Sequence, residues 1–124
     1  MSGDRRRPLG AAGERIVAEQ LKARGYDILA VNWRCRVGEI DVIASKDGTI
    51  AFVEVRSRSV KTLGVFGAPL ESVTPKKRYK VRRVAEAYLQ QTATTPARVR
   101  FDCAGVVLDG DGHVVNFDYV EDAF

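Results

Sequence analysis

The sequence predicts a mixed α/β fold in which helices flank a sheet, with elements in the order α-β-β-β-α-β-β. Two segments, residues 9–25 and 74–91, repeat apolar residues with a helical period. Five shorter segments alternate or cluster β-branched and aromatic residues, as strands do. The second helix lies between strands, which favours a mixed sheet. A chain of 124 residues supports one hydrophobic core, so we predict a single domain over residues 1–124.

The first predicted helix spans residues 9–25 and ends at Gly25. Glu14 flanks its apolar stripe, because it precedes Val17 by three residues and Leu21 by seven. A carboxylate at the edge of a core needs a partner. We predict that residues 1–8 form a flexible basic arm. The apolar stripe comprises Leu9, Ala12, Ile16, Val17 and Leu21.

Three strand-like runs follow, at residues 26–33, 38–44 and 49–58, with the turn sequence SKDG between the last two. Residues 59–73 contain two glycines and a proline without a clear period, and we predict a loop there. Fifteen residues is long for a loop in a small domain, which favours substrate gating or dimer formation. A simple surface excursion is the alternative.

The second predicted helix begins after the N-cap residue Thr74, with Pro75 in its first turn, and runs to about Gln91. Two further strands, at residues 99–109 and 113–120, surround the turn sequence GDG. The predicted core stripe of this helix comprises Val81, Val84, Ala85, Tyr88 and Leu89.

Charge is distributed unevenly along a chain whose net charge is +4. Residues 74–83 carry six basic residues and no acid, whereas residues 102–124 carry six acids and no Lys or Arg. This asymmetry favours a polyanionic partner, of which nucleic acid is the commonest. A solvated basic helix face is the alternative interpretation.

Several classes of protein are disfavoured by the composition. No apolar run approaches the ~20 residues that cross a bilayer, and no apolar segment follows the charged start, so we expect a cytoplasmic protein without a membrane partner. Cys35 and Cys103 are far apart and are expected to be structural thiols. His113 lies in a turn and is expected to be a plain residue at the start of a strand. Any metal is therefore expected to have oxygen ligands, which favours magnesium, manganese or calcium.

The hairpin at residues 38–58 places acids where a strand pair prefers neutral residues. If residues 46–49 form the turn, Ser45 pairs with Ile50 and Asp41 lies opposite Glu54 on the same face. Directly opposed Cβ atoms lie about 4.5 to 5.5 Å apart, and like charges at that spacing repel. Protonation of one acid, or a cation between them, would relieve the repulsion. Magnesium commonly binds one or two carboxylates together with waters and phosphates.

The face of Glu54 also carries bases, because strand alternation places Arg56 and Arg58 beside it. Acids for a metal and bases for a phosphate are thus predicted side by side. The prediction that acids and bases lie side by side depends on this hairpin register. If it slips by one residue, Glu39 and Asp41 become solvent-facing strand acids, and Glu54 and Arg56 become a surface ion pair.

Asp41, a hairpin turn and then Glu54-x-Arg56 on the next strand resemble the signature of the restriction-endonuclease-like (PD-(D/E)xK) nucleases, which is an acid, a hairpin turn and then Glu-x-Lys. The chain resembles more closely the YraN-like family, small bacterial proteins of the same superfamily. The resemblance covers about residues 9–104. It is carried by GAAGERIVAEQLKARGYDILAVNWR, GEIDVIA, FVEVRSR, TPKKR and RFD.

This resemblance implies a restriction-endonuclease-like fold, with Glu14, Asp41 and Glu54 as an acidic cluster that binds Mg²⁺ or Mn²⁺. In the archaeal Holliday-junction resolvases, a Glu on the first helix completes the site, and Glu14 is the corresponding residue that the resemblance implies here. Glu39 either assists or pairs with a nearby base. Arg56 occupies the place of the usual Lys; it keeps the charge but does not give up its proton under ordinary conditions. Arg58 and Lys76 are the residues considered as helpers.

The resemblance and the charges together predict a metal-dependent nuclease, or a protein derived from one, that acts on structured or branched DNA. Its catalytic residues would be Glu14, Asp41, Glu54 and Arg56. A homodimer is expected by analogy with resolvases, because a four-way junction presents two scissile strands. The alternatives are a nucleic-acid-binding or scaffold module without turnover, and a protein-binding role for the loop and the acidic tail. The predicted nucleic-acid contacts are Lys76, Lys77, Arg78, Lys80, Arg82, Arg83 and Arg58.

Overall fold

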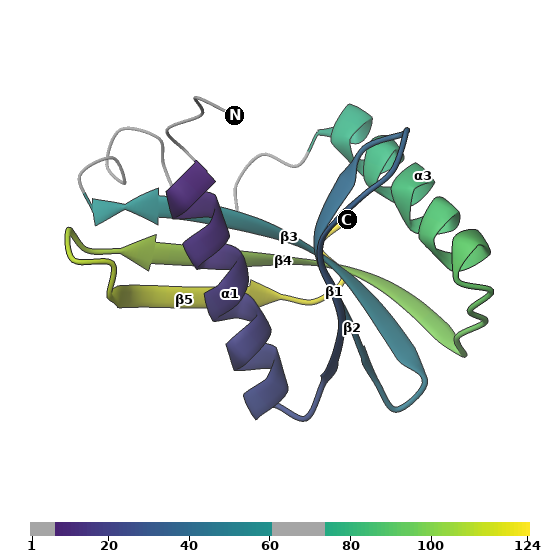
Figure 1. Cartoon of the computed structure of the whole chain (residues 1–124), viewed down its shortest axis with the longest axis horizontal. Coiled ribbons are helices and arrows are strands. Elements are labelled where there is room, and N and C mark those ends of the chain that lie inside the picture. The colour runs from purple at the N-terminus through teal and green to yellow at the C-terminus, as the bar shows by residue number, and fades with distance from the viewer. Residues whose placement is uncertain (1–6, 61–73) are drawn as a thin grey trace.

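The computed structural model describes residues 7–60 and 74–124, and the side chains from Gly10 onward within the first range (Figure 1). The elements follow the predicted order α-β-β-β-α-β-β, so the predicted fold class is confirmed. They are α1 (Arg7–Ala23), β1 (Asp27–Arg34), β2 (Glu39–Lys46), β3 (Thr49–Ser59), α3 (Pro75–Gln91), β4 (Arg98–Leu108) and β5 (Val114–Val120).

All five strands belong to one sheet in the order β1-β2-β3-β4-β5. Neighbouring strands are antiparallel except β3 and β4, which run parallel. A parallel pair requires the chain to cross back between its strands, and α3 lies on that connection. The helix that interrupts the strand series in the sequence is thus the reason that the sheet is mixed.

Helices α1 and α3 pack on opposite faces of the sheet (Figure 1). On the α1 face, Val17 and Leu21 pack with Val42 and Val53. On the α3 face, the predicted stripe residues Val81, Val84, Ala85 and Tyr88 are buried, and Leu89 is partly buried. The helical stripes predicted for both helices are confirmed wherever their side chains are described; that of Leu9 lies outside the described residues.

Most helix and strand ends differ by one or two residues from the prediction, and the boundaries of the predicted arm and loop shift accordingly. Arg7 and Pro8, predicted in the basic arm, belong to α1, because Pro is well suited to the first turn of a helix. Ser59, predicted in a loop, still pairs with Leu108 at the end of β3. The rest of the predicted arm, residues 1–6, and the predicted loop from residue 61 to 73 lie outside the described residues.

The register of the hairpin is confirmed. Ser45 pairs with Ile50, and the pairing continues to Val42 and Val53. The ladder ends at that pair, one position before Asp41. The alternative, a slip of one residue, is therefore excluded, but the β2–β3 ladder stops where the acidic residues begin.

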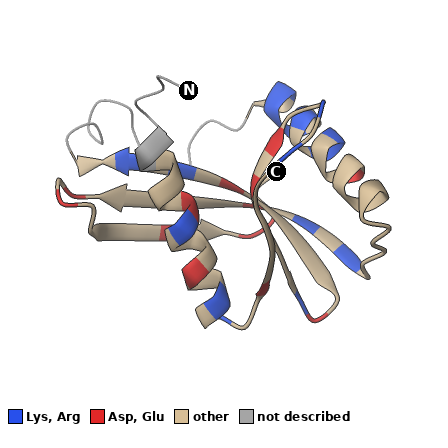
Figure 2. Ribbon diagram, viewed as in Figure 1, with Lys and Arg blue, Asp and Glu red and all other residues tan. Residues whose placement is uncertain are grey.

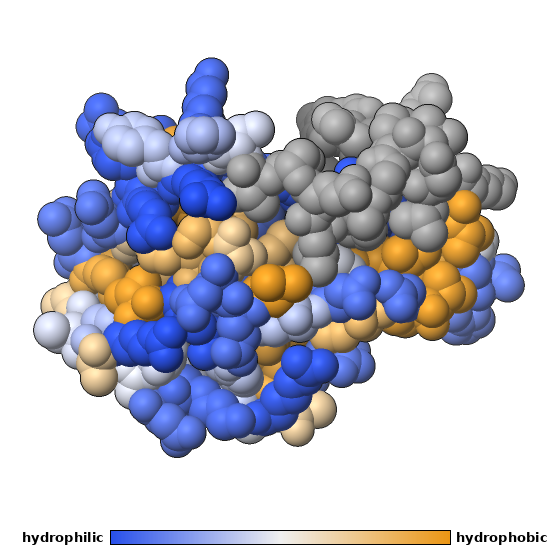
Figure 3. All heavy atoms as spheres, turned by 180° about the vertical axis from the view of Figure 1, so that it is seen from behind, coloured by the Kyte–Doolittle hydropathy of each residue, from blue (hydrophilic) through white to orange (hydrophobic). Residues whose placement is uncertain are grey.

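The edges of the sheet carry apolar side chains that reach solvent. Leu29 and Val31 are exposed on β1, and Val114, Val115 and Val120 are exposed on β5. Figure 3 shows hydrophobic side chains at separate places on one face, with hydrophilic ones between them. Within residues 7–60 and 74–124, no helix is long and apolar enough to cross a membrane.

Both cysteines are free thiols. Cys103 is buried in β4, and burial raises the pKa of its thiol to about 11. A thiol with so high a pKa is almost wholly protonated at neutral pH and is a poor nucleophile. This agrees with the structural role that the sequence predicts for it.

Candidate functional site

The sheet loses its regular alternation at Asp41. Ile40 and Ile43 both pack on the α3 face, although residues three apart on a regular strand face opposite ways. Val42, between Asp41 and Ile43, packs on the α1 face. The β1 register places Asn32 opposite Asp41, and Asn32 has a left-handed backbone with φ of 53°. Asp41 therefore lies where the backbone is distorted on β1 and the β2–β3 ladder ends.

The side chain of Asp41 takes over a hydrogen bond that the ladder no longer makes. Its Oδ2 accepts from the backbone N–H of Val55 at 2.7 Å. A continued ladder would offer such an N–H a backbone carbonyl from β2. The carboxylate thus lies between the separating strands β2 and β3 and is within reach of groups from both faces of the sheet.

Glu14 approaches Asp41 from α1, and Gly13 explains how the helix comes so close. A Cβ atom at Gly13 would lie 1.9 Å from Ser57 Oγ and 3.2 Å from Ser57 Cβ, so only glycine permits this contact with β3. The next residue, Glu14, is half-buried and shares a hydrogen bond with Asp41. The carboxylate at the core edge, which the sequence showed to need a partner, has one.

The charged groups that shift the pKa of Asp41 are all acids, whereas Glu14 has one cation, Arg34, among the groups that shift its pKa. Burial, and to a smaller extent the charges of Glu54, Glu14 and Glu39, raise the pKa of Asp41 to about 7, although the hydrogen bond from the Val55 N–H opposes the shift. Burial also raises the pKa of Glu14; the hydrogen bond to Asp41 opposes this, and the charge of Glu39 adds to it. Asp41 therefore retains its proton up to near-neutral pH. Protonation is one of the two ways in which the sequence allowed the repulsion to be relieved.

Glu54, in contrast, has cationic neighbours. Its Oε2 lies 2.5 Å from Lys77 Nζ and 3.6 Å from Arg56 Nε. The side chain of Glu54 is 14% exposed, as is that of Arg56, whereas that of Lys77 is 42% exposed. The lysine that reaches the acids is thus Lys77 on α3, whereas the sequence pointed to Lys76 or Arg58 as helpers.

The contact of Lys77 with Glu54 was missed, although the helical period contains a signal for it. Lys77 precedes Val81 by four residues and Val84 by seven, so it extends the buried stripe of α3 toward the N-terminus. A lysine at such a position can lay its stem along the core and direct its ammonium group to a buried acid. The predicted stripe begins at its first apolar residue, Val81, and this start leaves Lys77 among the solvent-facing bases.

A cavity of about 410 Å³ lies between the acids and the start of α3. Its acidic side is formed by Glu39, Asp41 and Glu54, and basic residues gather along the first turns of α3 (Figure 2). Glu39 also pairs with Arg34 at 3.1 Å, which is the second of the two roles expected for it. Carboxylates and ammonium groups thus face one space. The other lining residues are Gly38, Thr74, Lys76, Lys77, Lys80, Val81 and Val84.

The remaining predicted nucleic-acid contacts do not join the three lysines in lining this cavity. Arg82 donates to the backbone oxygen of Phe124 at 3.0 Å and lies over the ring of Phe101. Arg83 donates to the hydroxyl of Tyr79 at 3.2 Å. Arg58 donates to the Ser57 carbonyl at 3.1 Å. Arg78 is exposed on α3 outside the set of residues that line the cavity.

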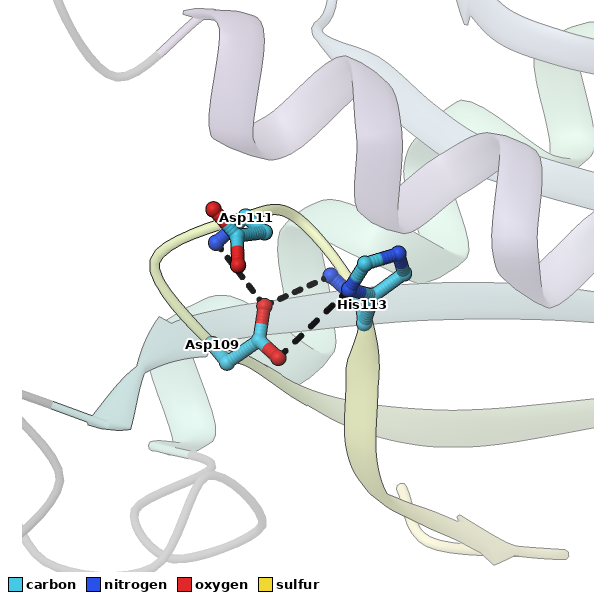
Figure 4. Close-up of side chains that lie close together, drawn as sticks. All are labelled: Asp109, Asp111 and His113. Carbon is cyan, nitrogen blue, oxygen red and sulfur yellow. Dashed lines mark hydrogen bonds and ion pairs between the residues drawn. The ribbon is translucent and has the colours of Figure 1, made fainter.

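A second acidic group lies in the turn between β4 and β5 (Figure 4). Asp109, Asp111 and His113 are the only trio of potential metal ligands in the described part of the chain whose ligand atoms lie within 4.8 Å of one another. Asp109 Oδ1, however, accepts from the backbone N–H groups of Asp111 and His113, both at 2.9 Å. These hydrogen bonds account for the arrangement as a turn, with His113 just before β5.

Glu14, Asp41 and Glu54 are less compact than that trio. Mg²⁺ commonly takes one or two carboxylates and completes its octahedron with water. The donor set is entirely oxygen, and the like charges at Asp41 would be relieved by a cation. These residues therefore fit a magnesium ion bound through one or two direct ligands, and they do not fit a metal enclosed by protein groups.

The fold and the site define the class: a small α/β protein in which half-buried acids, one of them with a raised pKa, border a cavity that lysines also line. The uncharacterised protein family UPF0102 matches this chain over residues 13–106, and the chain belongs to that family. The YraN-like membership that the sequence motifs indicate is thereby confirmed.

Three bacterial relatives show how far the similarity extends. A UPF0102 protein of Caldicellulosiruptor bescii is 41% identical over 117 residues, which cover 94% of this chain and 96% of the relative. One from Moorella thermoacetica is 41% identical over 119 residues, with 96% and 97% covered. One from Nocardia farcinica is 42% identical over 116 residues, with 94% and 88% covered. The similarity therefore includes both helices and all five strands.

Proposed function

We propose that this protein is a magnesium-dependent nuclease of the restriction-endonuclease-like superfamily, which hydrolyses phosphodiester bonds in structured or branched DNA. One observation carries the proposal. Asp41 on β2 and Glu54 on β3 share a cavity with Lys76, Lys77 and Lys80, and Glu14 approaches Asp41 from α1. A phosphodiester bound to a divalent cation needs both kinds of group.

Asp41 and Glu54 would hold Mg²⁺ or Mn²⁺, with Glu14 acting through water. A bound divalent ion supplies Lewis-acid chemistry, because it polarises a phosphodiester and lowers the pKa of water. The raised pKa of Asp41 supports this assignment, because a carboxylate that is costly to ionise alone gains most from a cation. Proton release on metal binding is the expected consequence.

The chain's own bases would perform the remaining steps. Arg56, which is 14% exposed beside Glu54, would stabilise negative charge that develops on the phosphate. Lys76 and Lys80 would hold the backbone of the nucleic acid without reading its bases, which favours selectivity for structure over sequence. Nuclease activity, the cytoplasmic location and the homodimer all stay predictions.

The first test combines calorimetric titration of Mn²⁺ and Mg²⁺ with cleavage of a labelled four-way junction in the same buffers. We expect the wild type to bind Mn²⁺ and to cut the junction in a metal-dependent way, and the Asp41→Asn variant to lose both properties. The His113→Ala variant is the matched control, because it removes a potential ligand from the other acidic group. Binding that survives Asp41→Asn but not His113→Ala would place the metal in the β4–β5 turn and contradict the proposal.

A nucleic-acid-binding module without turnover is the second candidate, and the presence of Arg56 in the place of the usual lysine favours it. The same experiment separates the two. Metal binding and salt-dependent junction binding without cleavage, in the presence of Mg²⁺ or Mn²⁺, would support the binding module.

A further inference from the structure

The position of Lys77 on α3 is fixed by the cap of the helix. The Thr74 side chain accepts the backbone N–H of Lys77 at 3.1 Å, and Pro75 begins the helix. Side chains on a helix point back toward its N-terminus. The cap therefore determines where the stem of Lys77 begins, and its Nζ ends 2.5 Å from Glu54 Oε2.

Lys77 and Arg56 contact the same oxygen of Glu54 but differ in their freedom to move away. The side chain of Arg56 is 14% exposed on β3 and that of Lys77 is 42% exposed on a flexible four-carbon stem. Moving a buried guanidinium away from its acid costs far more than moving an ammonium that already meets solvent. Of these two cations, Lys77 is the one that can exchange.

The cavity gives the displaced ammonium group a place to act. Lys80, one turn along α3, lines the same cavity as Lys77, Asp41 and Glu54. On the opposite side, a Cβ atom at Gly38 would lie 3.2 Å from Val84 Cγ2 and 3.4 Å from Lys80 Cε, so the wall is close to α3 there. An anion in this cavity would lie between the acids and the two lysines.

We propose that Lys77 is an exchangeable counter-ion of Glu54: it yields that carboxylate to a divalent cation and then binds the substrate phosphate at the reaction centre. This inference rests on the proposed function and names a further catalytic residue, supplied by α3 instead of β3. Its contribution is charge alone, since no proton or covalent bond is transferred.

The test compares Lys77→Met with Lys80→Met, because both lysines line the cavity on the same helix. For Lys77→Met, we expect kcat on the four-way junction to fall by about 100-fold, as for loss of a charge-stabilising donor, with little change in KM. We expect Mn²⁺ to bind a few-fold more tightly, because the competing ammonium is gone. Lys77→Arg should recover part of kcat. Lys80→Met should raise KM with kcat unchanged and should leave Mn²⁺ affinity unchanged.

The outcomes separate the two proposals. If the wild type binds Mn²⁺ and cuts, while Lys77→Met behaves like the wild type or like Lys80→Met, only the role of Lys77 is overturned. If the wild type binds Mn²⁺ without cutting, the proposed nuclease fails. In that case tighter Mn²⁺ binding by Lys77→Met supports the exchange, and unchanged or weaker binding overturns it. A wild type that binds no Mn²⁺ contradicts both proposals.

Discussion

Asp102 and Asp41 are both acids withdrawn from solvent in strands of the same sheet, yet their surroundings differ. The side chain of Asp102 is fully buried and accepts from Arg100, from the Tyr119 hydroxyl and from the backbone N–H of Asp122. Burial lowers the pKa of Arg100, but its hydrogen bonds to Asp102 and Tyr26 outweigh this and raise it above the ordinary value. Hydrogen bonds thus surround both partners of this ion pair.

Asp41 has one backbone donor, Val55, and the charged groups that shift its pKa are all acids. Its pKa is raised to about 7, and that of its neighbour Glu14 is raised as well. The fold therefore pairs Asp102 with a cation and leaves Asp41 without one, so that Asp41 holds a proton or a ligand. Such an imbalance lowers stability, and it is typical of sites that bind something.

The largest effect that follows from this comparison is on Asp102. We expect Asp102→Asn to lower the free energy of unfolding by about 3 to 5 kcal/mol, because it leaves the buried guanidinium of Arg100 without its main anion. Urea denaturation at pH 8 measures this change. Asp122→Asn is the control: its ion pair with Arg98 is 60% exposed on both sides and should contribute less than about 1 kcal/mol. Equal losses in the two variants would show that the Asp102 network is not special.

The same substitution at Asp41 should raise the free energy of unfolding instead of lowering it. The unfolded state releases its Asp proton near the ordinary pKa of about 3.9, whereas the native state holds it to about 7. Native protein thus binds more protons in this window, and wild-type stability falls as pH rises from about 4 to 7. An asparagine side chain at this position keeps an oxygen for the Val55 N–H but cannot ionise. We expect Asp41→Asn to be more stable than the wild type by about 1 to 2 kcal/mol at pH 8. A pKa difference of one corresponds to ~1.4 kcal/mol of stability, and the half-burial of Asp41 reduces this contribution.

Denaturation at pH 4 and at pH 8 measures this difference, which should nearly vanish at pH 4. Saturating Mg²⁺ should reduce it at pH 8, since a ligand that binds only the native wild type stabilises it. A loss of stability in Asp41→Asn at pH 8 would mean that Asp41, like Asp102, is a structural acid.

The fold could be predicted because its signals are local. The stripe of Val81, Val84 and Tyr88 and the turn at residues 46–49 depend on residues that are close in the sequence, and these predictions are confirmed. The turn fixed the hairpin register, and both Asp41 and Glu54 line the same cavity, although the ladder ends one pair before them.

What could not be predicted depends on how distant segments meet. The end of the β2–β3 ladder turns Asp41 toward both α1 and β3, whereas strand alternation placed it on one face. The pairing of Lys77 with Glu54 depends on where the start of α3 lies over β3. Arg82 is a residue type that commonly contacts DNA, but its side chain donates to the backbone oxygen of Phe124 and lies over the ring of Phe101. Charge patterns predict that a basic surface exists but do not tell which bases face the acids.

The smallest effect concerns Gly13, which brings Glu14 to Asp41. Gly13→Ala places a methyl group against Ser57 Oγ, and overpacking costs about 1 to 3 kcal/mol, but alanine gains about 1 kcal/mol over glycine in a helix. The net loss of stability should therefore be small.

Displacing α1 moves the charge of Glu14 away, so the pKa of Asp41, followed by NMR titration of its carboxyl carbon, should fall below about 7. The Gly13→Ala, Ser57→Ala double variant removes the 1.9 Å contact with Oγ and leaves the 3.2 Å contact with Cβ, so it should return the titration of Asp41 toward that of the wild type. Ser57 Oγ has no hydrogen-bond partner within the described residues, so its removal costs little. An unchanged pKa in Gly13→Ala would mean that burial and Glu54 alone set the charge of Asp41, and that Glu14 takes no part in the contrast with Asp102.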